Sequence, residues 1–408
     1  MRIIILSDNE TSGGAAIAAS RLASALTLED VEVIRIVGRA DGNEHPWTTI
    51  PLQVRLYEEM VLEVIGRVSQ RLITALKALI LRRRLNGVLK KLRPNIINVH
   101  NLHGAGWGIE LVNVCSRNAP VVWTLHDMWS FTGRCAYTSS CCNFTGGCDG
   151  SCPTFAEYPA LAPNLIAEAW RRRRDLMSAL PNLVAVTPSK WLSREARAGF
   201  WAGHQVEVVP NGLPLGIYGP LSTILDREAL GFDARARVLM IAAPKLSEKR
   251  KGMSYLREAL QRLSYGPVTV ITLGTGGLGF ELPGIHLHQL GYIDHERTKV
   301  LAYSAADIFV HPALLDNLPN VVMEAIACGT PVVGFPVGGV PEMVNPGSTG
   351  WLMDEVSPEA LARTLDVALD DLDRGVDLRE RCRAQAEAEY DVSIQAKRYL
   401  ELFRSLMG

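Results

Sequence analysis

Two carboxylates separated by seven residues are the side chains of this sequence most suited to holding a polar ligand. Asp316 and Glu324 lie within HPALLDNLPNVVMEAIACGTPVV, residues 311–333, a stretch with little other charge. The residues before them, ADIFVHP, are typical of a buried strand, and VVMEAIAC is typical of a helix that ends at Gly329. Pro319 suits the first helical turn, where a missing N–H has no consequence. We therefore expect a strand, a loop that carries Asp316, and a helix that carries Glu324 about one turn from its start.

The start of that helix predicts an anion site. Asn317, Leu318 and Asn320 would present backbone N–H groups there, and the N-terminal end of a helix attracts negative charge. A sugar nucleotide fits both features, with its phosphates at the helix start and its hydroxyl groups on the two carboxylates. Spacing alone leaves open an ordinary strand–turn–helix with an exposed acid and a capping asparagine.

A loop rich in cations follows another predicted strand. The strand VLMIA leads into PKLSEKRKG, residues 244–252, which contains Lys245, Arg250 and Lys251. Phosphate groups are bound by such cations, because lysine acts as a point charge and arginine as a forked donor. The alternative is a solvated, charged turn.

Two glycines and a histidine follow strands in the first half. Gly13 and Gly14, after the first strand, let the backbone approach a ligand at the start of a helix, or serve only a tight turn. His126 ends the strand VVWTL, at the edge of a parallel sheet where ligands bind, although a structural role is the alternative. His100 and His103, after the preceding strand, are weaker candidates.

Five cysteines lie within the eighteen residues CAYTSSCCNFTGGCDGSC. Buried structural thiols do not usually cluster in this way, and in a reducing compartment such a group favours a metal over disulfides. Cys135, Cys141, Cys148 and Cys152 could hold one tetrahedral zinc ion in a structural site. The spacing is looser than that of paired C-x2-C motifs, so a loop of free or oxidised thiols stays open.

The elements that must position these residues are short β-branched strands that alternate with helices. In the first half they are RIIILSD, VEVIRIVG, NIINVHN, PVVWTLHD, LVAVTPS and VEVVPNG, and after residue 236 they are RVLMIAAP, VTVITLGT, IHLHQLG, DIFVHPA and TPVVGFP. Strands without polar alternation, separated by helices, are typical of parallel sheets covered on both faces. Two such sets in 408 residues predict two doubly wound α/β domains with a seam near residues 210–222.

The composition excludes several other classes. A net charge of -1 gives no field that would attract nucleic acid. MRIIILSDNE is too short an apolar run for a signal peptide, and no stretch of about 18 residues stays apolar enough to span a bilayer. We therefore expect a cytoplasmic protein.

Residues 55–93 predict a basic amphipathic segment. Its apolar positions at helical spacing are Val61, Val64, Ile65, Val68, Leu72, Leu76 and Leu79, and its cations are Lys77, Arg82, Arg83, Arg84, Lys90, Lys91 and Arg93. Such segments bind anionic lipid, which suggests peripheral contact with the inner face of the plasma membrane. A core-facing helix with a charged outer side is the alternative.

The motifs together resemble the signature of family 4 retaining glycosyltransferases, also described as group 1 glycosyltransferases. The similarity runs through SGGAAIAASRLASAL, NIINVHNLHG, WTLHDMWSFTGRC, VTPSKWL, VVPNGLP, YSAADIFVHP, DNLPNVVMEAIACGTPVV, VGGVPEMV and GSTGWL, and so covers nearly the whole chain. The resemblance implies the GT-B fold, in which two Rossmann-like domains face each other across a cleft.

The resemblance also assigns domains. It implies an acceptor-side domain over 1–210, with the cysteine-rich insertion 133–153 and the basic segment 55–93, a linker over 211–236, and a nucleotide-sugar domain over 237–385. The last residues, 386–408, are expected to form a helix that could pack back on the first domain.

The resemblance further implies roles for single residues. Asp316 and His126 would contact the donor sugar, Glu324 the ribose, Lys245 and Lys251 the diphosphate. The glycine loop at Gly13 and Gly14 would lie against the phosphates and the acceptor. Two residues depart from the usual pattern: Asp316 replaces the usual glutamate, which leaves the donor sugar open, and Lys245 replaces an arginine.

The implied reaction moves a hexose from a nucleoside diphosphate sugar to a glycan or lipid-linked hydroxyl acceptor, with retention and without a metal in the chemistry. A sugar-nucleotide 2-epimerase of the same architecture is one alternative, and a non-catalytic zinc-bearing binding protein is another. Two weaker motifs are rejected: LGTGGLGF lacks the helix that a dinucleotide fingerprint requires, and DDLD at 370–373 is expected to be a solvated helix face.

Overall fold

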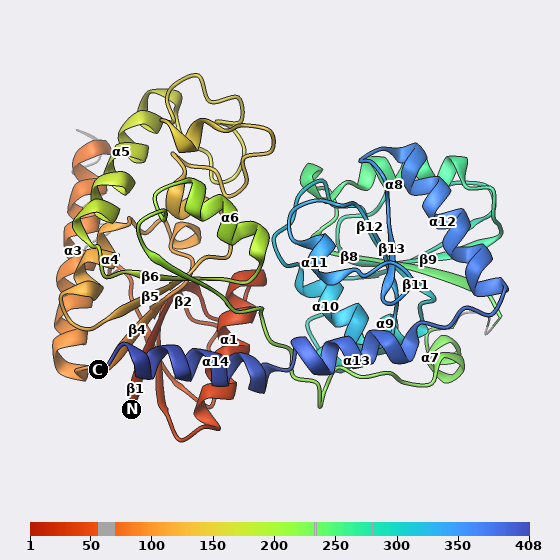
Figure 1. The fold of residues 1–408 in the computed structure, drawn as a ribbon, viewed down its shortest axis with the longest axis horizontal. Coiled ribbons are helices and arrows are strands. Elements are labelled where there is room, and N and C mark those ends of the chain that lie inside the picture. Colours follow the sequence, from red (N-terminus) through yellow and green to blue (C-terminus); the bar gives the residue numbers. More distant parts are fainter. Residues whose placement is uncertain (56–69, 232, 234, 280) are drawn as a thin grey trace. The chain divides into compact units, whose positions relative to one another are not determined.

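The computed structural model describes residues 1–55, 70–231, 233, 235–279 and 281–408 (Figure 1). The chain forms two compact units: Met1–Val209 together with Ala396–Gly408, and Pro210–Gln395. Each unit contains one parallel sheet with helices on both faces, so the predicted pair of Rossmann-like domains is confirmed.

The first unit contains a seven-stranded sheet in the order β3-β2-β1-β4-β5-β6-β7. Its elements are β1 (Arg2–Asn9), α1 (Gly14–Thr27), β2 (Glu32–Arg39), β3 (Thr48–Pro51), α3 (Gln70–Leu92), β4 (Ile96–Val99), η1 (His103–Ala105), α4 (Glu110–Ser116), β5 (Val121–Thr124), η2 (Trp129–Phe131), η3 (Asn143–Thr145), α5 (Pro163–Ala179), β6 (Val184–Thr187), α6 (Lys190–Ala198), β7 (Gln205–Val208) and most of α14 (Val392–Ser405). The order reverses between β1 and β4, and ligands of such sheets bind at this point, beyond the carboxyl ends of the strands.

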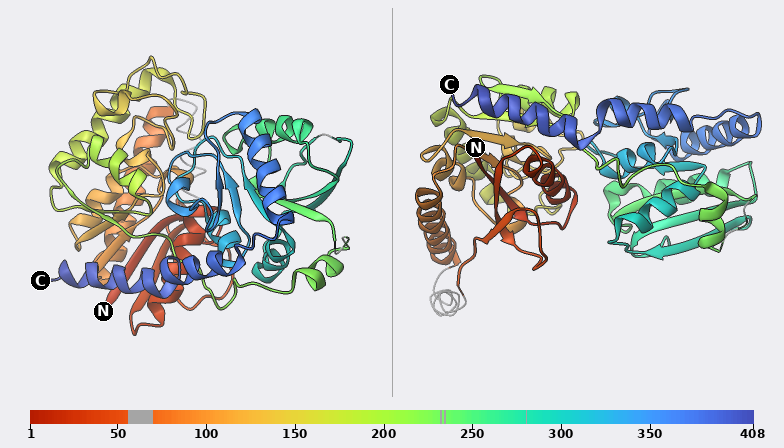
Figure 2. Two further views of the ribbon diagram at one scale, coloured as in Figure 1. Left: turned by 45° about the vertical axis from the view of Figure 1, so that its right-hand side comes forward. Right: turned by 90° about the horizontal axis from the view of Figure 1, so that it is seen from below.

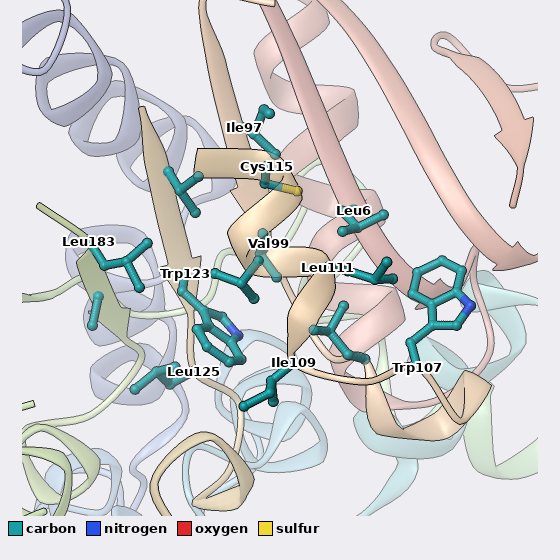
Figure 3. Close-up of a cluster of buried hydrophobic side chains, with 14 of the residues drawn as sticks. Leu6, Ile97, Val99, Trp107, Ile109, Leu111, Cys115, Trp123, Leu125 and Leu183 are labelled. Atoms are coloured by element: carbon teal, nitrogen blue, oxygen red, sulfur yellow. The ribbon is translucent and has the colours of Figure 1, made fainter. Parts of the chain in front are cut away.

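The strands of this sheet are buried because their side chains are apolar on both faces. Figure 3 shows one core cluster, in which Leu6, Val99 and Trp123 from three strands pack with Leu111 and Cys115 of α4. The opposite face of β5 carries Thr124, whose hydroxyl lies 2.9 Å from that of Tyr399 in α14. The carboxyl edge of the sheet is therefore held by packing on both sides.

The second unit contains a six-stranded sheet in the order β10-β9-β8-β11-β12-β13, which reverses between β8 and β11. Its elements are α7 (Thr223–Ala229), β8 (Arg237–Lys245), η4 (Lys249–Lys251), α8 (Met253–Arg262), β9 (Val268–Thr275), β10 (Ile285–Gly291), α9 (Glu296–Ala305), β11 (Ile308–His311), α10 (Asn320–Ala327), β12 (Val332–Gly334), α11 (Val340–Met343), β13 (Gly350–Leu352), α12 (Pro358–Asp373) and α13 (Arg379–Glu389).

Alternate residues of β8 enter two different cores. Met240 packs with the apolar side chains of α9, α10 and α13, whereas Leu239 and Ile241 pack with those of α8 and α12. Figure 2 lets the reader follow the helices on the two faces of this sheet. The continuous apolar runs of the sequence are thus explained by burial on both sides.

Two segments differ in detail from the sequence expectations. Most of the apolar positions of the basic segment 55–93 fall in 56–69, outside the described residues; within α3, Leu85 and Leu89 are buried while Leu72 and Leu79 are 47% and 39% exposed. The final segment is not one helix, because α13 ends before Tyr390 and α14 begins at Val392.

Candidate functional site

The candidate residues of the second unit lie at the reversal point of its sheet. The cationic loop follows β8, and the loop that carries Asp316 follows β11, the neighbouring strand. The two loops contact each other, since the N–H of Leu314 donates to the carbonyl oxygen of Arg250 at 2.8 Å. The structure therefore places Arg250, Lys251 and Asp316 together.

Asp316 is the centre of this group. Its Oδ2 lies 2.7 Å from Lys251 Nζ, 3.4 Å from Arg250 Nη1 and 3.8 Å from His311 Nε2. Arg250 Nη1 also donates to the carbonyl oxygen of Leu315 at 2.7 Å. Asp316 is only 7% exposed, so its charge is held by these neighbours rather than by solvent.

The electrostatics of the group favour an ionised carboxylate and a neutral imidazole. Burial opposes ionisation of Asp316, but the positive charges of Lys251 and Arg250 hold its pKa well below the usual range. Burial lowers the pKa of His311 to about 4, with Lys251 and Arg250 adding to the effect and Asp316 opposing it. At neutral pH the site is therefore a carboxylate between two cations, beside an uncharged histidine.

Two glycines let the loops approach this closely. Gly252 has φ +70, and a Cβ there would lie 1.8 Å from the carbonyl oxygen of Pro312. Gly338 has φ +57, and a Cβ there would lie 1.8 Å from the carbonyl oxygen of Asp316. A side chain at either position would push the loops of the site apart.

Helix α10 begins at Asn320, so Pro319 immediately precedes the helix and does not lie in its first turn, as the sequence had suggested. The Asn317 N–H is not open to a ligand, because it donates to Asp316 Oδ1 at 3.1 Å, which corrects the expectation from sequence. Leu318 is 7% exposed and packs in the core of the second unit.

Glu324 lies one turn into α10, as expected, and is 5% exposed. Its Oε2 accepts a hydrogen bond of 3.0 Å from the hydroxyl of Tyr303 in α9. Burial, with the Glu324 charge as the next cause, raises the pKa of Tyr303 well above its usual value, so the phenol keeps its proton and donates it. Tyr303 thus fixes the orientation of the Glu324 carboxylate.

Lys245 is exposed at the end of β8, and its carbonyl oxygen accepts from the N–H of Glu248 at 3.2 Å. The cations that the structure places on Asp316 are Lys251 and Arg250. Lys245 lies at the start of the same loop, with its side chain in solvent.

In the first unit, Gly13 and Gly14 join β1 to α1. Gly13 has φ +92, and a Cβ there would meet no atom within 4 Å. Both glycines are exposed, so Gly13 is required by its backbone conformation and not by close packing.

His126 belongs to a hydrogen-bonded chain that fixes its proton. The Asn98 amide donates to Thr124 Oγ1 at 2.9 Å, and its Oδ1 lies 2.8 Å from His100 Nε2, which must therefore donate. His100 Nδ1 is then an acceptor and takes the Nε2–H of His126 at 2.8 Å. Burial, with His103 as a second cause, lowers the pKa of His126 to about 4. His126 is thus a neutral imidazole whose Nδ1 is an acceptor.

His103 lies in a second polar group at the same edge. Its Nε2 is 3.5 Å from Asp127 Oδ2, and its ring packs against those of Trp129 and Tyr158. Asp8, at the end of β1, accepts from the N–H of Gly104 at 3.1 Å; burial raises its pKa, and His103 opposes the rise.

The cysteine-rich insertion is a loop in which several thiols contact neighbouring polar groups. Cys135 Sγ and Cys152 Sγ lie 3.6 Å and 3.7 Å from Thr154 Oγ1, and Gly133 N–H donates to Cys148 Sγ at 3.3 Å. All eight cysteines are free thiols.

One possible metal-binding triad was not selected from the sequence. Among the described residues, Glu10, Asp41 and His45 are the group of at least three His, Cys or acidic side chains whose ligand atoms lie within 4.8 Å of one another. Both Glu10 oxygens already accept hydrogen bonds, from Trp47 and Thr49 and from the N–H of Asp41, so we assign it no ion.

The two rejected motifs have structural roles. After β9, the described residues up to Gly284 contain no helix, so LGTGGLGF is not a dinucleotide site. In DDLD, Asp371 Oδ2 accepts from Trp351 Nε1 at 3.0 Å and Asp373 pairs with Arg237, which corrects the expectation of a merely solvated face. A surface hollow lined by Arg2, Asp30 and Arg93 lies at the amino edge of the first sheet, where such sheets do not bind ligands.

The sequence reasoning missed Asp8, His311 and Tyr303 as members of these groups. Asp8 and His311 each lie near the carboxyl end of a strand at a reversal point, and that position was a usable signal. Tyr303 lies on a different helix from Glu324, so no local pattern links them.

Two known protein families match parts of this chain. Residues 12–216 match the family described as Glycosyltransferase Family 4, and residues 237–389 match Glycosyl transferases group 1. The first of these covers half of the chain. The protein therefore belongs to glycosyltransferase family 4.

Individual relatives share only a low sequence identity with this chain. The putative colanic acid biosynthesis glycosyl transferase WcaC of Escherichia coli (strain K12) is 24% identical over 250 residues, which are 59% of each chain. The chain thus spans less than two thirds of that relative's length. Sucrose-phosphate synthase from Thermosynechococcus elongatus has a TM-score of 0.74 at 20% identity, with 99% and 98% of the two chains covered. Anabaena HepE, solved with UDP and glucose, has a TM-score of 0.68 at 16% identity over all of both chains.

Proposed function

We propose that this protein is a retaining glycosyltransferase that moves a hexose from a nucleoside diphosphate sugar to a hydroxyl acceptor. The observation that carries the proposal is the buried Asp316 carboxylate between Lys251 and Arg250, beside the start of α10 at the reversal point of a doubly wound sheet. Such a point is where phosphate-bearing ligands bind in this class of sheet. The likeness to HepE shows the fold alone. The proposal of a nucleoside diphosphate sugar as the donor therefore rests on Lys251 and Arg250.

Donor binding would replace the Asp316 carboxylate by the diphosphate as the partner of Lys251. Lys251 donates to Asp316 in this structure, and a diphosphate that takes over Lys251 would release the carboxylate to accept hydrogen bonds from sugar hydroxyls. Glu324, already oriented by Tyr303, would accept from the ribose hydroxyls. Arg250 and the exposed Lys245 would add charge at the diphosphate.

The chemical step breaks the bond between the anomeric carbon and the diphosphate oxygen, whose electron pair stays on the diphosphate. The acceptor oxygen bonds to the same face of the anomeric carbon, and its proton passes to the departing phosphate oxygen. Lys251 and Arg250 stabilise the charge that grows there, a contribution of the kind that is typically the largest in such reactions. His126, kept neutral by its hydrogen-bonded chain, would accept from a sugar hydroxyl through Nδ1.

No metal takes part in this proposed chemistry, because the cations of the loop take its electrostatic role. Addition of a chelator should leave the transfer rate unchanged. If chelation abolishes transfer and magnesium restores it, a metal holds the diphosphate and the assignment of Lys251 is wrong.

We further propose that the acceptor is a growing polysaccharide or a lipid-linked glycan, and that the protein works in the cytoplasm at the inner face of the plasma membrane. In support, α3 combines exposed Leu72 and Leu79 with a run of cations. Among the described residues, no helix has the length and apolar character to cross a bilayer. We propose a peripheral contact made by α3.

Vesicle sedimentation tests the membrane contact. Binding should be stronger to vesicles that contain phosphatidylglycerol than to pure phosphatidylcholine, and should weaken with added salt. Arg83→Glu should reduce it, while Arg194→Glu, an equal charge change on the exposed side of α6, should not. Equal binding to both vesicle types would contradict the proposal.

Incubation with labelled nucleoside diphosphate sugars tests the reaction itself. Transfer to an added acceptor, or slow hydrolysis without one, supports a glycosyltransferase, and NMR of the product decides whether the anomeric configuration is retained. Formation of the 2-epimer would show the alternative isomerase. No turnover and no nucleotide binding would indicate a non-catalytic binding protein.

A further inference from the structure

We propose that the insertion after η2 binds one structural zinc ion through the thiolates of Cys135, Cys141, Cys148 and Cys152. The inference concerns a site separate from the proposed donor-binding residues and does not depend on the glycosyltransferase reaction. It rests on the convergence of the thiols, on two buried arginines beside them and on the construction of the loop.

The thiols of the insertion converge on one region. Cys135 and Cys152 share Thr154 Oγ1 as a neighbour, although sixteen residues separate them. Cys148 receives an N–H bond from Gly133, and a Cβ at Gly133 would lie 2.7 Å from the Cys148 Cβ. Cys141 lies in the same loop, where its N–H donates to the carbonyl oxygen of Thr138 at 2.9 Å.

Two buried arginines beside the thiols carry unpaired donors. Arg134 and Arg173 are 2% and 7% exposed, and among the described residues Arg134 Nη2 and Arg173 Nε have no hydrogen-bond partner. Other nitrogens of the two groups have partners: Arg134 Nε donates to the carbonyl oxygen of Pro159 at 3.0 Å, and Arg173 Nη1 donates to that of Gly133 at 3.0 Å. A buried, unpaired guanidinium N–H is costly, and a thiolate sulfur would accept it.

The charges of such a site also balance. Four neutral thiols that bind one Zn²⁺ release four protons and leave a group with a net charge of minus two. The two guanidinium groups offset that charge within a region from which water is largely excluded.

The loop has little else to hold it. From Thr132 to Ala162 the only regular element is η3, and a chain of this length without strands or helices is unusual in a compact domain. Phe144, buried against Phe131 and bonded through its carbonyl oxygen to Trp170 Nε1 at 3.1 Å, anchors its middle. A metal cross-link would fix the two ends of the loop to each other.

The fit is not complete without rotation of side chains. Among the described residues no three cysteine sulfurs lie within 4.8 Å of one another, whereas four ligands around one zinc ion would. Rotation about the Cα–Cβ bonds of Cys141 and Cys148, both half-buried, must close the site. Cys142 is left out because it is exposed and its Sγ lies 3.7 Å from the carbonyl oxygen of Ser140. It therefore provides a matched control.

Metal analysis of the full chain tests the proposal. Protein purified with a reducing agent and without chelator should contain about one zinc per chain, as should Cys142→Ser. Cys148→Ser should retain less than about a tenth of the metal after dialysis against a weak chelator, because a structural site needs all four ligands. Cobalt added to metal-depleted wild type should give the visible bands of a tetrahedral thiolate site, a readout that does not need any variant to fold.

Two outcomes would overturn the proposal. The first is wild-type protein without metal, with all five thiols of the insertion open to titration and no cobalt bands. The second is loss of metal from Cys142→Ser as complete as from Cys148→Ser, which would remove the ligand set proposed here.

Discussion

The two sheets end in polar groups of opposite character. In the second unit, Asp316 is held between Lys251 and Arg250, so full charges decide the geometry. In the first unit, Asn98, His100 and His126 form a chain of neutral groups in which hydrogen bonds decide it. Both groups lie at the reversal point of a parallel sheet, so the fold provides the position and the local residues provide the chemistry.

The difference indicates which kind of ligand suits the carboxyl edge of each sheet. A diphosphate is an anion that can replace Asp316 as the partner of Lys251, whereas the chain of Asn98, His100 and His126 consists of neutral groups. Hydroxyl groups need acceptors and donors with fixed protons, and His126 provides one. Four predictions test this division, starting with the largest expected effect.

Loss of Lys251 should harm turnover most. Lys251→Ala removes a contact that strengthens as the diphosphate leaves, so kcat should fall roughly a hundredfold or more, equivalent to about 3–4 kcal/mol. Lys251→Arg should retain part of the rate. Lys249→Ala, in the same turn but exposed, is the matched control and should be close to wild type. Equal rates for the Lys249 and Lys251 alanine variants would show that the charge of Lys251 does not contribute to turnover.

Loss of Glu324 should affect nucleotide binding rather than turnover. Glu324→Ala should weaken binding of the matching nucleoside diphosphate by about 1–3 kcal/mol, because buried hydroxyl groups would be left without an acceptor. Tyr303→Phe should weaken it less, by about 1 kcal/mol, since only the orientation of the carboxylate is lost. Calorimetry measures both. If neither variant changes the affinity, the ribose does not contact Glu324.

Acid should destabilise the second unit through His311. Its folded pKa, about 4, lies below the unfolded value of 6.5, so the unfolded state takes up the proton first and stability is lost as pH falls from about 6.5 towards 4. Between pH 7 and pH 5 this amounts to about 2 kcal/mol. Hydrogen exchange of β11 amides should show that loss in wild type and not in His311→Gln. The same slope in both proteins would exclude His311 as the cause.

The smallest effect is expected at Asp371. Asp371→Ala removes the hydrogen bond from Trp351, so the free energy of unfolding should fall by about 1 kcal/mol or less. The transfer rate should not change, because the carboxylate lies on α12, outside the group of Asp316. A large fall in rate with normal stability would restore the metal–diphosphate interpretation of DDLD.

The architecture could be predicted from sequence because central strands are continuous apolar runs. Two strands were missed, β3 and β13, and both lie at sheet edges. β3 is TTIP and only partly buried, and β13 is the three residues Gly350–Leu352, so neither has the pattern of a strand covered on both faces. Edge strands need less apolar surface, so a continuous apolar run does not mark them in the sequence.

The candidate residues could be predicted only as far as local spacing reaches. The loop after β8 and the acids near α10 were visible as short motifs, yet the pairing of Lys251 with Asp316 joins positions 65 residues apart. The Asn317 N–H was expected to be open to a ligand, but the neighbouring carboxylate takes it. Such contacts depend on how the loops meet, and residue types alone do not specify that.

The place of α14 has a consequence for how the chain is made. From Ala396 on, its residues belong to the first unit, where Tyr399 bonds to Thr124. During synthesis the whole of Pro210–Gln395 leaves the ribosome before those residues do. The first half must therefore wait, with the part of its sheet that α14 contacts still uncovered, while the second half can already fold. Nascent chains stalled before Ala396 should therefore be the forms most dependent on chaperones.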